Sequence, residues 1–346
     1  MSLNNEAEKY LNSLLSLQYY GLDNIVYESV DENKIYDAVV SSRFRKSKID
    51  EITIKDIKNK IRMSLDHDEP LKFAVPFGAY KAWRLNMDFQ PDWAEVFNIS
   101  YYLKYAVNIL KYYSKGIEIA YTFSDNLMYF VSDIPKNKAE NYAVVFEDLL
   151  GLFNQLSDKI QFKLVRINDL YNNQEEYYID FLKCFLDNLV FWDSKYDESV
   201  KSRHLNSSYH NLYLYGERNV GDKSEDVREK YYYYSALMTD AVDCLKERRK
   251  YNKNQDRIQL VSVKGPSKCI NMGACETSAV HFWTGRGFLK YNKNIIKPYI
   301  YTQSSIKKIE TENIVVDLYV DTIFKTISKN YEVISFIKEE KRNEKN

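Results

Sequence analysis

Apolar and polar positions follow two different periods along this chain. Short apolar runs of about seven residues, each followed by polar or glycine-containing turn residues, predict buried strands at 71–77, 117–123, 161–167 and 257–263. Longer segments with an apolar residue at every third or fourth position predict helices at 6–20, 53–65, 91–115, 136–156, 173–191 and 223–250. Because strands and helices alternate, we expect an α/β fold with a largely parallel sheet flanked by helices.

Both ends of the chain have a different pattern. Residues 31–50 are polar and mixed, and the basic run 43–48 within them is expected to form a solvated loop. Residues 279–283 and 287–291 predict an antiparallel pair around the turn Gly285-Arg286-Gly287, and 314–320 a further strand before a helix-like 321–329 and a frayed end from Lys338. We therefore divide the chain into an N-terminal helical segment that packs on the core, a main α/β domain and a C-terminal extension, with bounds 1–66, 67–300 and 301–346.

One helix has a clear start signal. In Pro91-Asp92-Trp93-Ala94-Glu95, the Asp92 side chain can accept a hydrogen bond from the first turn while Glu95 reaches back to the Asp92 backbone. This capping box explains Glu95 without a catalytic role.

In a parallel sheet, ligands bind outside the carboxyl ends of the strands. The turns that follow the predicted strands hold Phe77 to Lys81, Ser124-Asp125, Asn168-Asp169 and Lys264 to Lys268. These segments are the candidate site before any chemistry is considered.

Composition and charge argue against several classes of protein. The 49 Lys and Arg residues balance 49 Asp and Glu residues, which disfavours a strongly basic nucleic-acid-binding protein. No apolar run approaches the roughly 20 residues of a membrane span, and the first residues lack a signal-peptide pattern. The four cysteines form neither a disulfide framework nor a zinc pattern. We therefore expect a cytoplasmic protein without nucleic-acid or membrane partners; the oligomeric state stays open.

The 31 tyrosines are unusual. An interaction surface would explain them, but so would the codon usage of an AT-rich genome, which favours Tyr, Asn, Lys and Ile. The 36 Lys against 13 Arg favour codon usage.

Common catalytic motifs are absent. The chain has no dinucleotide-binding glycine motif, no P-loop and no nucleophile elbow, and its four histidines lack the spacing of a zinc site. A metal-free enzyme or a binding protein is left.

Short motifs that occur in order between about residues 53 and 300 resemble a known family. They lie at 68–81, 91–95, 112–125, 133, 166–171, 210–214, 257–264 and 283–285. As an ordered set they resemble the pyoverdine/dityrosine biosynthesis family, whose better-known members are isocyanide (isonitrile) synthases. Four polar positions depart from the family pattern: Asn126 replaces a glycine, Asn211 an arginine, and Lys264 and Thr284 a histidine each.

The resemblance implies a Rossmann-like fold and a reaction that joins the amine of an amino acid, typically Tyr or Trp, to the keto carbon of ribulose 5-phosphate. It implies a role in secondary-metabolite or siderophore-like biosynthesis and no metal or other cofactor. The partners would be two small molecules, an amino acid and a phosphosugar.

Such a condensation needs a cation that holds the phosphate, a base that frees the amine and an acid that removes hydroxide. The catalytic candidates are Asp125, His210 and Lys264. Asp125 could equally be an Asx-turn residue, and a lone histidine is usually structural. Lys264 would stay protonated at neutral pH unless it is buried.

The substrate-binding candidates are Lys81, Ser124, Asp169, Lys268, Trp283 and Arg286. Lys81 follows a strand end and could hold the phosphate, or it could be a solvated loop lysine. Lys264 and Lys268 flank a turn that could bind phosphate or simply lie on the surface. Arg286 could bind an anion through two guanidinium nitrogens. Its place between two glycines slightly favours a residue of a hairpin turn instead.

Two functions therefore stay open. The first is an isocyanide synthase-like enzyme, which Lys81, Asp125 and His210 favour. The second is a catalytically altered relative that binds a small anion or a partner, which the four departures favour.

Overall fold

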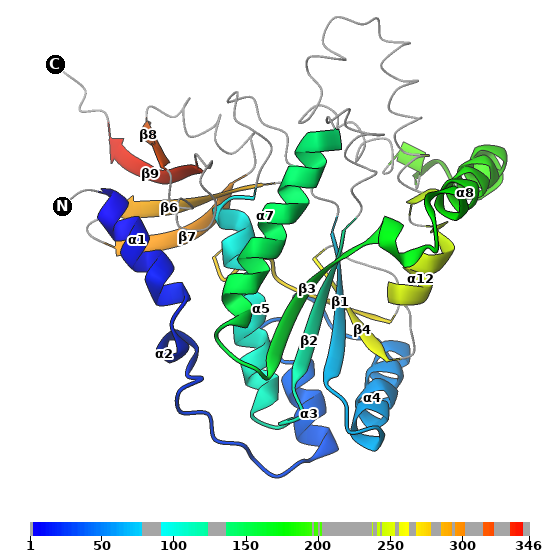
Figure 1. Ribbon diagram of the computed structural model, residues 1–346, viewed down its shortest axis with the longest axis horizontal. Helices are drawn as coiled ribbons and strands as arrows, with labels where there is room; N and C mark the ends of the chain where they lie inside the picture. The colour runs from blue at the N-terminus through cyan, green and yellow to red at the C-terminus, as the bar shows by residue number, and fades with distance from the viewer. Residues whose placement is uncertain are drawn as a thin grey trace, which may run out of the picture.

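A five-stranded parallel sheet lies at the centre of the molecule (Figure 1). The computed structural model describes residues 3–77, 91–123, 136–195, 197–199, 201–202, 237, 241–242, 244–252, 256–262, 268–277, 285–292, 295–301, 314–321 and 333–341. The strands, in spatial order, are β3 (Ile160–Arg166), β2 (Ile117–Phe123), β1 (Leu71–Phe77), β4 (Arg257–Val261) and β5 (Cys269–Asn271). Every neighbouring pair is parallel, which confirms the predicted α/β fold of the Rossmann-like type and its common carboxyl edge.

The helix α5 (Trp93–Leu110) packs on one face of this sheet and is buried at every position except Lys104 and Asn108. The predicted capping box at Asp92 and Glu95 is present. On the sheet side, Tyr102 makes an edge contact with Tyr121 of β2. The helix α7 (Lys136–Asn154) packs on the same face, where Phe146 meets Tyr121 at 5.1 Å between ring centroids.

Buried tyrosines join α5 to the N-terminal helices. Tyr105 donates to the carbonyl of Val39 at the end of α3 (Glu32–Val39), at 2.8 Å. Tyr113, just after α5, donates to the carbonyl of Ser64 in α4 (Glu51–Asp66), at 3.0 Å. Each tyrosine supplies core volume through its ring and satisfies a buried carbonyl through its hydroxyl, so these tyrosines serve packing rather than an exposed surface.

Several local predictions were wrong at the N-terminus. The predicted helix 6–20 is two helices, α1 (Leu3–Leu14) and α2 (Leu17–Tyr20), because Ser16 caps the second one. The polar stretch 31–50, in which we predict no helix, contains α3, which Asp31 caps. Phe44, within the basic run, is buried against Tyr101 and Tyr105.

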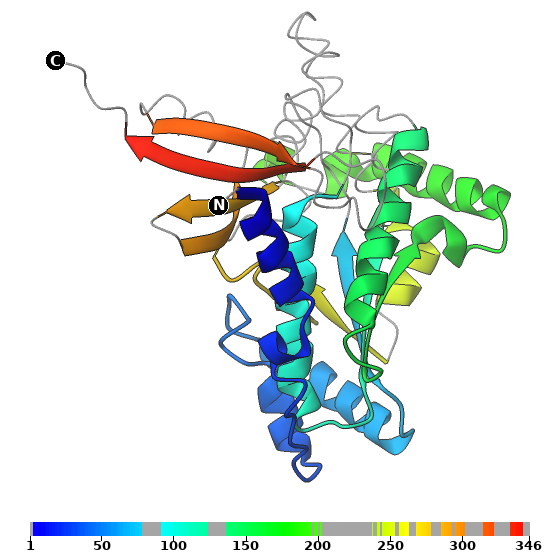
Figure 2. The same cartoon turned by 60° about the vertical axis from the view of Figure 1, so that its left-hand side comes forward.

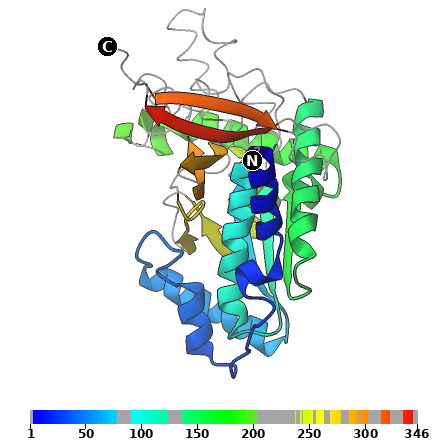
Figure 3. The same cartoon turned by 90° about the vertical axis from the view of Figure 1, so that its left-hand side faces the viewer.

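A second, four-stranded sheet has the order β7 (Ile295–Tyr301), β6 (Arg286–Asn292), β9 (Val333–Lys341) and β8 (Ile314–Asp321). Figures 2 and 3 show it at one end of the molecule, beside the start of α1. Two predictions were wrong here. Arg286 and Gly287 begin β6 and pair with β7 instead of forming a turn, and Lys338 to Lys341 belong to β9 instead of a frayed end. The predicted strand 279–283 and helix 321–329 lie outside the described residues.

The opposite face of the central sheet carries an ion network. Glu118 of β2 accepts from Arg257 of β4 at 2.5 Å and pairs with Lys163 of β3 at 2.8 Å. The ring of Tyr251, in α12 (Lys246–Asn252), lies 4.5 Å from the Arg257 guanidinium. Alternation along the strands places these charged residues opposite the apolar face that α5 and α7 cover.

This network predicts a pH-dependent contribution to stability. Burial raises the pKa of Glu118, but Lys163 and Arg257 outweigh burial and hold the pKa below its usual value of 4.5. A group whose pKa is lower in the folded state stabilises the protein above the unfolded pKa, and this stabilisation is lost as the pH falls through the folded pKa. We expect Glu118→Gln to lower the free energy of unfolding by about 1–3 kcal/mol at pH 7, and by progressively less as the pH falls from 4.5 through the lower pKa of the folded state. The measurement is urea unfolding of the unmodified protein and of Glu118→Gln at pH 7 and at acidic pH. An equal loss of unfolding free energy at both pH values would contradict an ionic origin of the stabilisation.

None of the helices in the described ranges contains an apolar stretch long enough to cross a membrane.

Candidate functional site

The carboxyl edge of the central sheet is formed by Phe77, Phe123, Arg166 and Val261. The loops that follow β1, β2 and β4 lie outside the described residues. The same is true of the candidates Lys81, Ser124, Asp125, His210, Lys264 and Trp283 and of the departures Asn126, Asn211 and Thr284. The candidate site is therefore built from the described side chains that reach this edge.

A buried polar cluster of Asp92, Glu95, Tyr142 and Arg286 lies at the start of α5. One carboxylate oxygen of Glu95 accepts from the backbone N–H of Asp92 at 2.7 Å, and the other accepts from the Tyr142 hydroxyl at 2.7 Å. The Arg286 Nε lies 3.7 Å from the Asp92 Oδ2. All four residues are almost fully buried, so these polar groups interact in a medium that screens charge weakly.

Two observations place this cluster at the carboxyl edge. The chain leaves β1 at that edge and enters α5 at Trp93, so α5 begins there and runs back along the sheet. The ring of Tyr142 also stacks on Phe123, the last residue of β2, with 5.9 Å between ring centroids. The cluster thus occupies the region where α/β proteins of this topology bind ligands.

Gly287 brings the second sheet against the cluster. Its backbone N–H donates to the Asp92 Oδ1 at 3.0 Å, while the same oxygen accepts from the N–H of Ala94 at 2.7 Å. A β-carbon on residue 287 would lie 2.0 Å from the backbone nitrogen of Ala94. Only a glycine allows the backbone of β6 to approach α5 this closely.

The charges in the cluster depend on one another. Burial lowers the pKa of the Arg286 guanidinium, and the nearby Asp92 and Glu95 oppose this effect. The guanidinium remains protonated because an arginine starts so far above neutral pH. Arg286 therefore lies near both carboxyl groups of the cluster, and charge pairing offsets part of the cost of burying these side chains.

A second polar contact continues along α5, away from the edge. The Tyr121 hydroxyl donates to Asn98 Oδ1 at 3.0 Å, and Asn98 Nδ2 donates to the carbonyl of Ala274 at 2.8 Å. Burial raises the pKa of Tyr121 well above its ordinary value, with smaller effects of Tyr102 and Glu95. Tyr121 therefore stays a neutral donor at physiological pH and fixes the rotation of α5 relative to β2.

An ion pair marks the end of β3. Arg166 donates two hydrogen bonds to Glu140 of α7. Its Nη1 and Nη2 atoms lie 2.6 and 2.7 Å from the two carboxylate oxygens. This hydrogen bonding lowers the pKa of Glu140 despite partial burial. The arrangement fixes the first turns of α7, which also carry Tyr142, against the carboxyl edge.

The described candidates have three different positions. Arg286 is buried in the cluster. Asp169 is exposed on the short helix η1 (Ile167–Leu170), directly after β3 and therefore at the same edge. Lys268 is exposed and precedes β5, where its backbone N–H donates to Thr53 Oγ1 at 2.8 Å. The strand registers place it level with Phe73, about 13 Å from the end of β1 at a rise of ~3.3 Å per residue. The structure brings Arg286 to the cluster but not Lys268.

Sequence reasoning missed Tyr142 and the contact between Asp92 and β6. The capping box was visible because its members are three residues apart, whereas Asp92 and Gly287 are separated by 195 residues. No local pattern in the sequence joins them.

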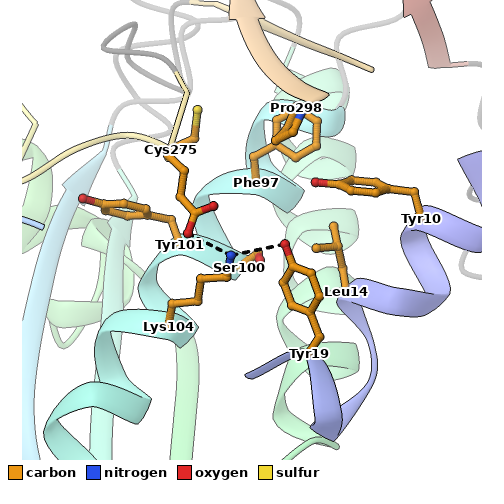
Figure 4. A pocket seen from close by; sticks show the side chains of 10 residues that line it. Tyr10, Leu14, Tyr19, Phe97, Ser100, Tyr101, Lys104, Cys275 and Pro298 are labelled. Atoms are coloured by element: carbon orange, nitrogen blue, oxygen red, sulfur yellow. Dashed lines mark hydrogen bonds and ion pairs between the residues drawn. The ribbon is translucent and has the colours of Figure 1, made fainter. Parts of the chain in front are cut away.

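A separate pocket lies on the side of α5 away from the sheet (Figure 4). Its walls come from α1, α2, α5 and the C-terminal part of the chain, and its lining residues are Tyr10, Leu14, Tyr19, Phe97, Ser100, Tyr101, Lys104, Cys275, Glu276 and Pro298. Lys104 bridges Tyr19 and Glu276 at 3.2 and 2.8 Å. The space suits about one ordered water. It is too small for a metabolite, so the carboxyl edge remains the candidate site.

No group of three or more His, Cys, Asp or Glu residues suited to a metal ion occurs within the part of the chain that the structure describes.

Comparison with known proteins gives a fold relation. Neither a protein-family model nor a curated protein sequence matches the chain. Among solved structures, the chain is similar to the PvcA protein from Pseudomonas aeruginosa, with a TM-score of 0.66 and 12% sequence identity. The match covers 88% of this chain and 99% of PvcA. At this identity the comparison shows a shared fold over nearly the whole of PvcA.

Proposed function

We propose that this chain is an isocyanide synthase-like biosynthetic enzyme that condenses the amine of a Tyr- or Trp-like amino acid with ribulose 5-phosphate or a similar phosphosugar. The observation that carries the proposal is the buried cluster of Asp92, Glu95, Tyr142 and Arg286 at the carboxyl edge. Asp92 and Glu95 belong to the Pro-Asp-x-x-Glu segment that resembles the family, and this edge is where proteins of this fold bind their ligands.

The fold supports the proposal independently. The motif resemblance implies a Rossmann-like domain, and the chain shares its architecture with PvcA over most of both proteins. Exposed Asp169 lies at the same edge, in a segment that also resembles the family.

The proposed division of labour follows from charge. Asp125, in the loop that follows β2, is our candidate for holding the amino-acid ammonium. The phosphate would need a separate fixed cation, because the chain is neutral overall and offers no general attraction for anions. Lys81, in the loop that follows β1, is our candidate for that cation. Asp125, His210 and Lys264 remain the candidates for proton transfer.

Mass spectrometry tests the reaction directly. The protein is incubated with ribulose 5-phosphate labelled with ¹³C at its keto carbon and with a pool of amino acids. An isocyanide that carries the label, derived from one amino acid of the pool, is the expected result. Label that stays entirely in the sugar would reject the enzyme proposal.

We expect Lys81→Ala to weaken binding of ribulose 5-phosphate by about 1.5–3 kcal/mol, the size of a charge-assisted hydrogen bond. Calorimetry measures the loss. The matched control is Lys58→Ala, since Lys58 of α4 lies over the ring of Tyr36 of α3, away from the carboxyl edge, and its removal should change binding little. Unchanged binding by Lys81→Ala would remove Lys81 as the anchor but keep the ligand.

The alternative is a catalytically altered relative that binds a small anion or a partner. The polar departures Asn126, Asn211, Lys264 and Thr284 favour it. Calorimetric binding of ribulose 5-phosphate without any labelled product would support this alternative, whereas no heat at millimolar ligand would reject the phosphosugar for both functions.

A further inference from the structure

The helix α8 (Gln174–Lys195) has apolar residues on two opposite faces. Its inner face is buried: Tyr177, Phe181 and Cys184 pack with Ala241, Val242 and Leu245 in a small core of their own. This contact anchors α8 to the rest of the molecule. The helix lies at the periphery of the molecule (Figures 1 and 2).

The outer face of α8 is exposed and apolar. It consists of Tyr178, Ile179, Leu182, Leu186, Leu189 and Val190, whose exposed fractions run from 45% to 70%. At 100° per residue these six side chains fall within about 120° of the helix circumference, and they extend over about 18 Å of its length. A contiguous apolar stripe of this kind on a soluble protein marks an interaction surface.

The stripe has a symmetry that points to its partner. Counted from Cys184, Tyr178 and Val190 lie six residues away on either side, Ile179 and Leu189 five, and Leu182 and Leu186 two. The apolar positions therefore read the same in both directions. In an antiparallel two-fold pair centred at this level, each apolar residue of the stripe therefore lies opposite an apolar residue of the other copy.

One pair of charged residues beside the stripe fits the same arrangement. Lys183 and Asp187 are both exposed and border the stripe on one side. In an antiparallel pair centred on residue 184, Asp187 of the second copy lies within about 3 Å of Lys183 along the helix axis, and the symmetric pair repeats this contact. Leu182 then faces Leu186 of the second copy, again twice. An anionic membrane surface fits less well, because Glu175 and Glu176 at the exposed start of α8 would be repelled.

We propose that the outer face of α8 binds a second copy of this chain, with the two α8 helices packed antiparallel about a two-fold axis near residue 184. The interface buries the apolar stripe and is bordered by two ion pairs between Lys183 and Asp187. The proposal is independent of the function of the carboxyl-edge site.

Sedimentation equilibrium of the full chain across a concentration series tests the proposal. The unmodified protein is expected to be a dimer, and Leu182→Glu is expected to raise the dimer dissociation constant about 100-fold or more, because the change places a charge against Leu186 at two symmetric positions. Leu186→Glu should act alike. The matched control is Val144→Glu, since Val144 is also exposed on a helix, at 54% on α7, but lies away from the stripe; it should leave the dimer unchanged.

A charge exchange tests the geometry. Lys183→Glu alone should weaken the dimer about tenfold, because like charges then meet across the interface. The double variant Lys183→Glu/Asp187→Lys should restore the dissociation constant to within about threefold of the original, since both pairs are rebuilt with opposite polarity. Urea unfolding of each variant at low concentration shows that the monomer fold is intact.

Three results would overturn the proposal: an unmodified protein that stays monomeric up to about 100 µM, a dimer that survives both Leu182→Glu and Leu186→Glu, or a double charge exchange no better than the single one. Binding of the monomeric protein to vesicles that contain anionic lipid would assign the stripe to a membrane surface instead.

Discussion

Replacing Gly287 with alanine is expected to lower the free energy of unfolding by about 3 kcal/mol. The new β-carbon would lie 2.0 Å from the nitrogen of Ala94 and 2.3 Å from the carbonyl carbon of Trp93. These are backbone atoms at the start of α5, so they cannot move aside as a flexible side chain would. Relief of the clash must separate β6 from α5, which also breaks the hydrogen bond from the residue 287 N–H to Asp92.

Urea unfolding measures this effect, and Gly151→Ala is the matched control. Gly151 lies within α7, and a β-carbon there would meet nothing within 4 Å. Because glycine costs about 0.5–1 kcal/mol relative to alanine inside a helix, Gly151→Ala should stabilise the protein by that amount. If both substitutions changed the free energy of unfolding in the same direction, the close approach of β6 to α5 would not be the reason for glycine at position 287.

Replacing Arg286 with methionine is expected to cost about 3–5 kcal/mol of stability, the usual loss when one partner of a buried ion pair is removed. Methionine fills much of the volume of arginine, so the loss is electrostatic rather than a cavity effect. It would leave Asp92 and Glu95, both almost fully buried, without the guanidinium that lies 3.7 Å from Asp92. Thermal and urea unfolding at pH 7 give the magnitude.

A double-mutant cycle separates charge from shape. Asp92→Asn keeps a side-chain oxygen for the helix cap and for the N–H of Gly287 but removes one negative charge. The double variant Arg286→Met/Asp92→Asn should therefore be clearly more stable than the sum of the single losses predicts, with a coupling of about 1–3 kcal/mol. Additive losses would mean that Arg286 contributes to stability mainly through packing.

The sequence predicted those features that depend on neighbours within a few residues. The four long strands of the central sheet were visible as apolar runs, and their parallel order followed from the helices between them. The capping box at Asp92 and Glu95 was visible because its members lie three residues apart. The carboxyl edge could be named as the candidate region because it follows from the topology alone.

The local pattern failed where packing against distant segments decides the structure. Residues 32–39 look polar, yet they form α3, because Ile35, Ala38 and Val39 are buried and Tyr105 binds the carbonyl of Val39. Arg286 and Gly287 have the composition of a turn, but β7 and α5 hold them in a strand.

By itself, then, the sequence determined the fold class, the carboxyl edge as the candidate ligand-binding region and the start of α5, since each rests on hydrogen bonding and periodicity within short stretches of chain. Only the tertiary structure decided that Arg286 and Tyr142 join Asp92 and Glu95, and that α8 leaves one of its two apolar faces exposed. These features depend on which distant surfaces meet. The free energy of such contacts comes from burial and charge pairing between segments that are far apart along the chain. No periodic pattern in the sequence shows that two such segments will meet.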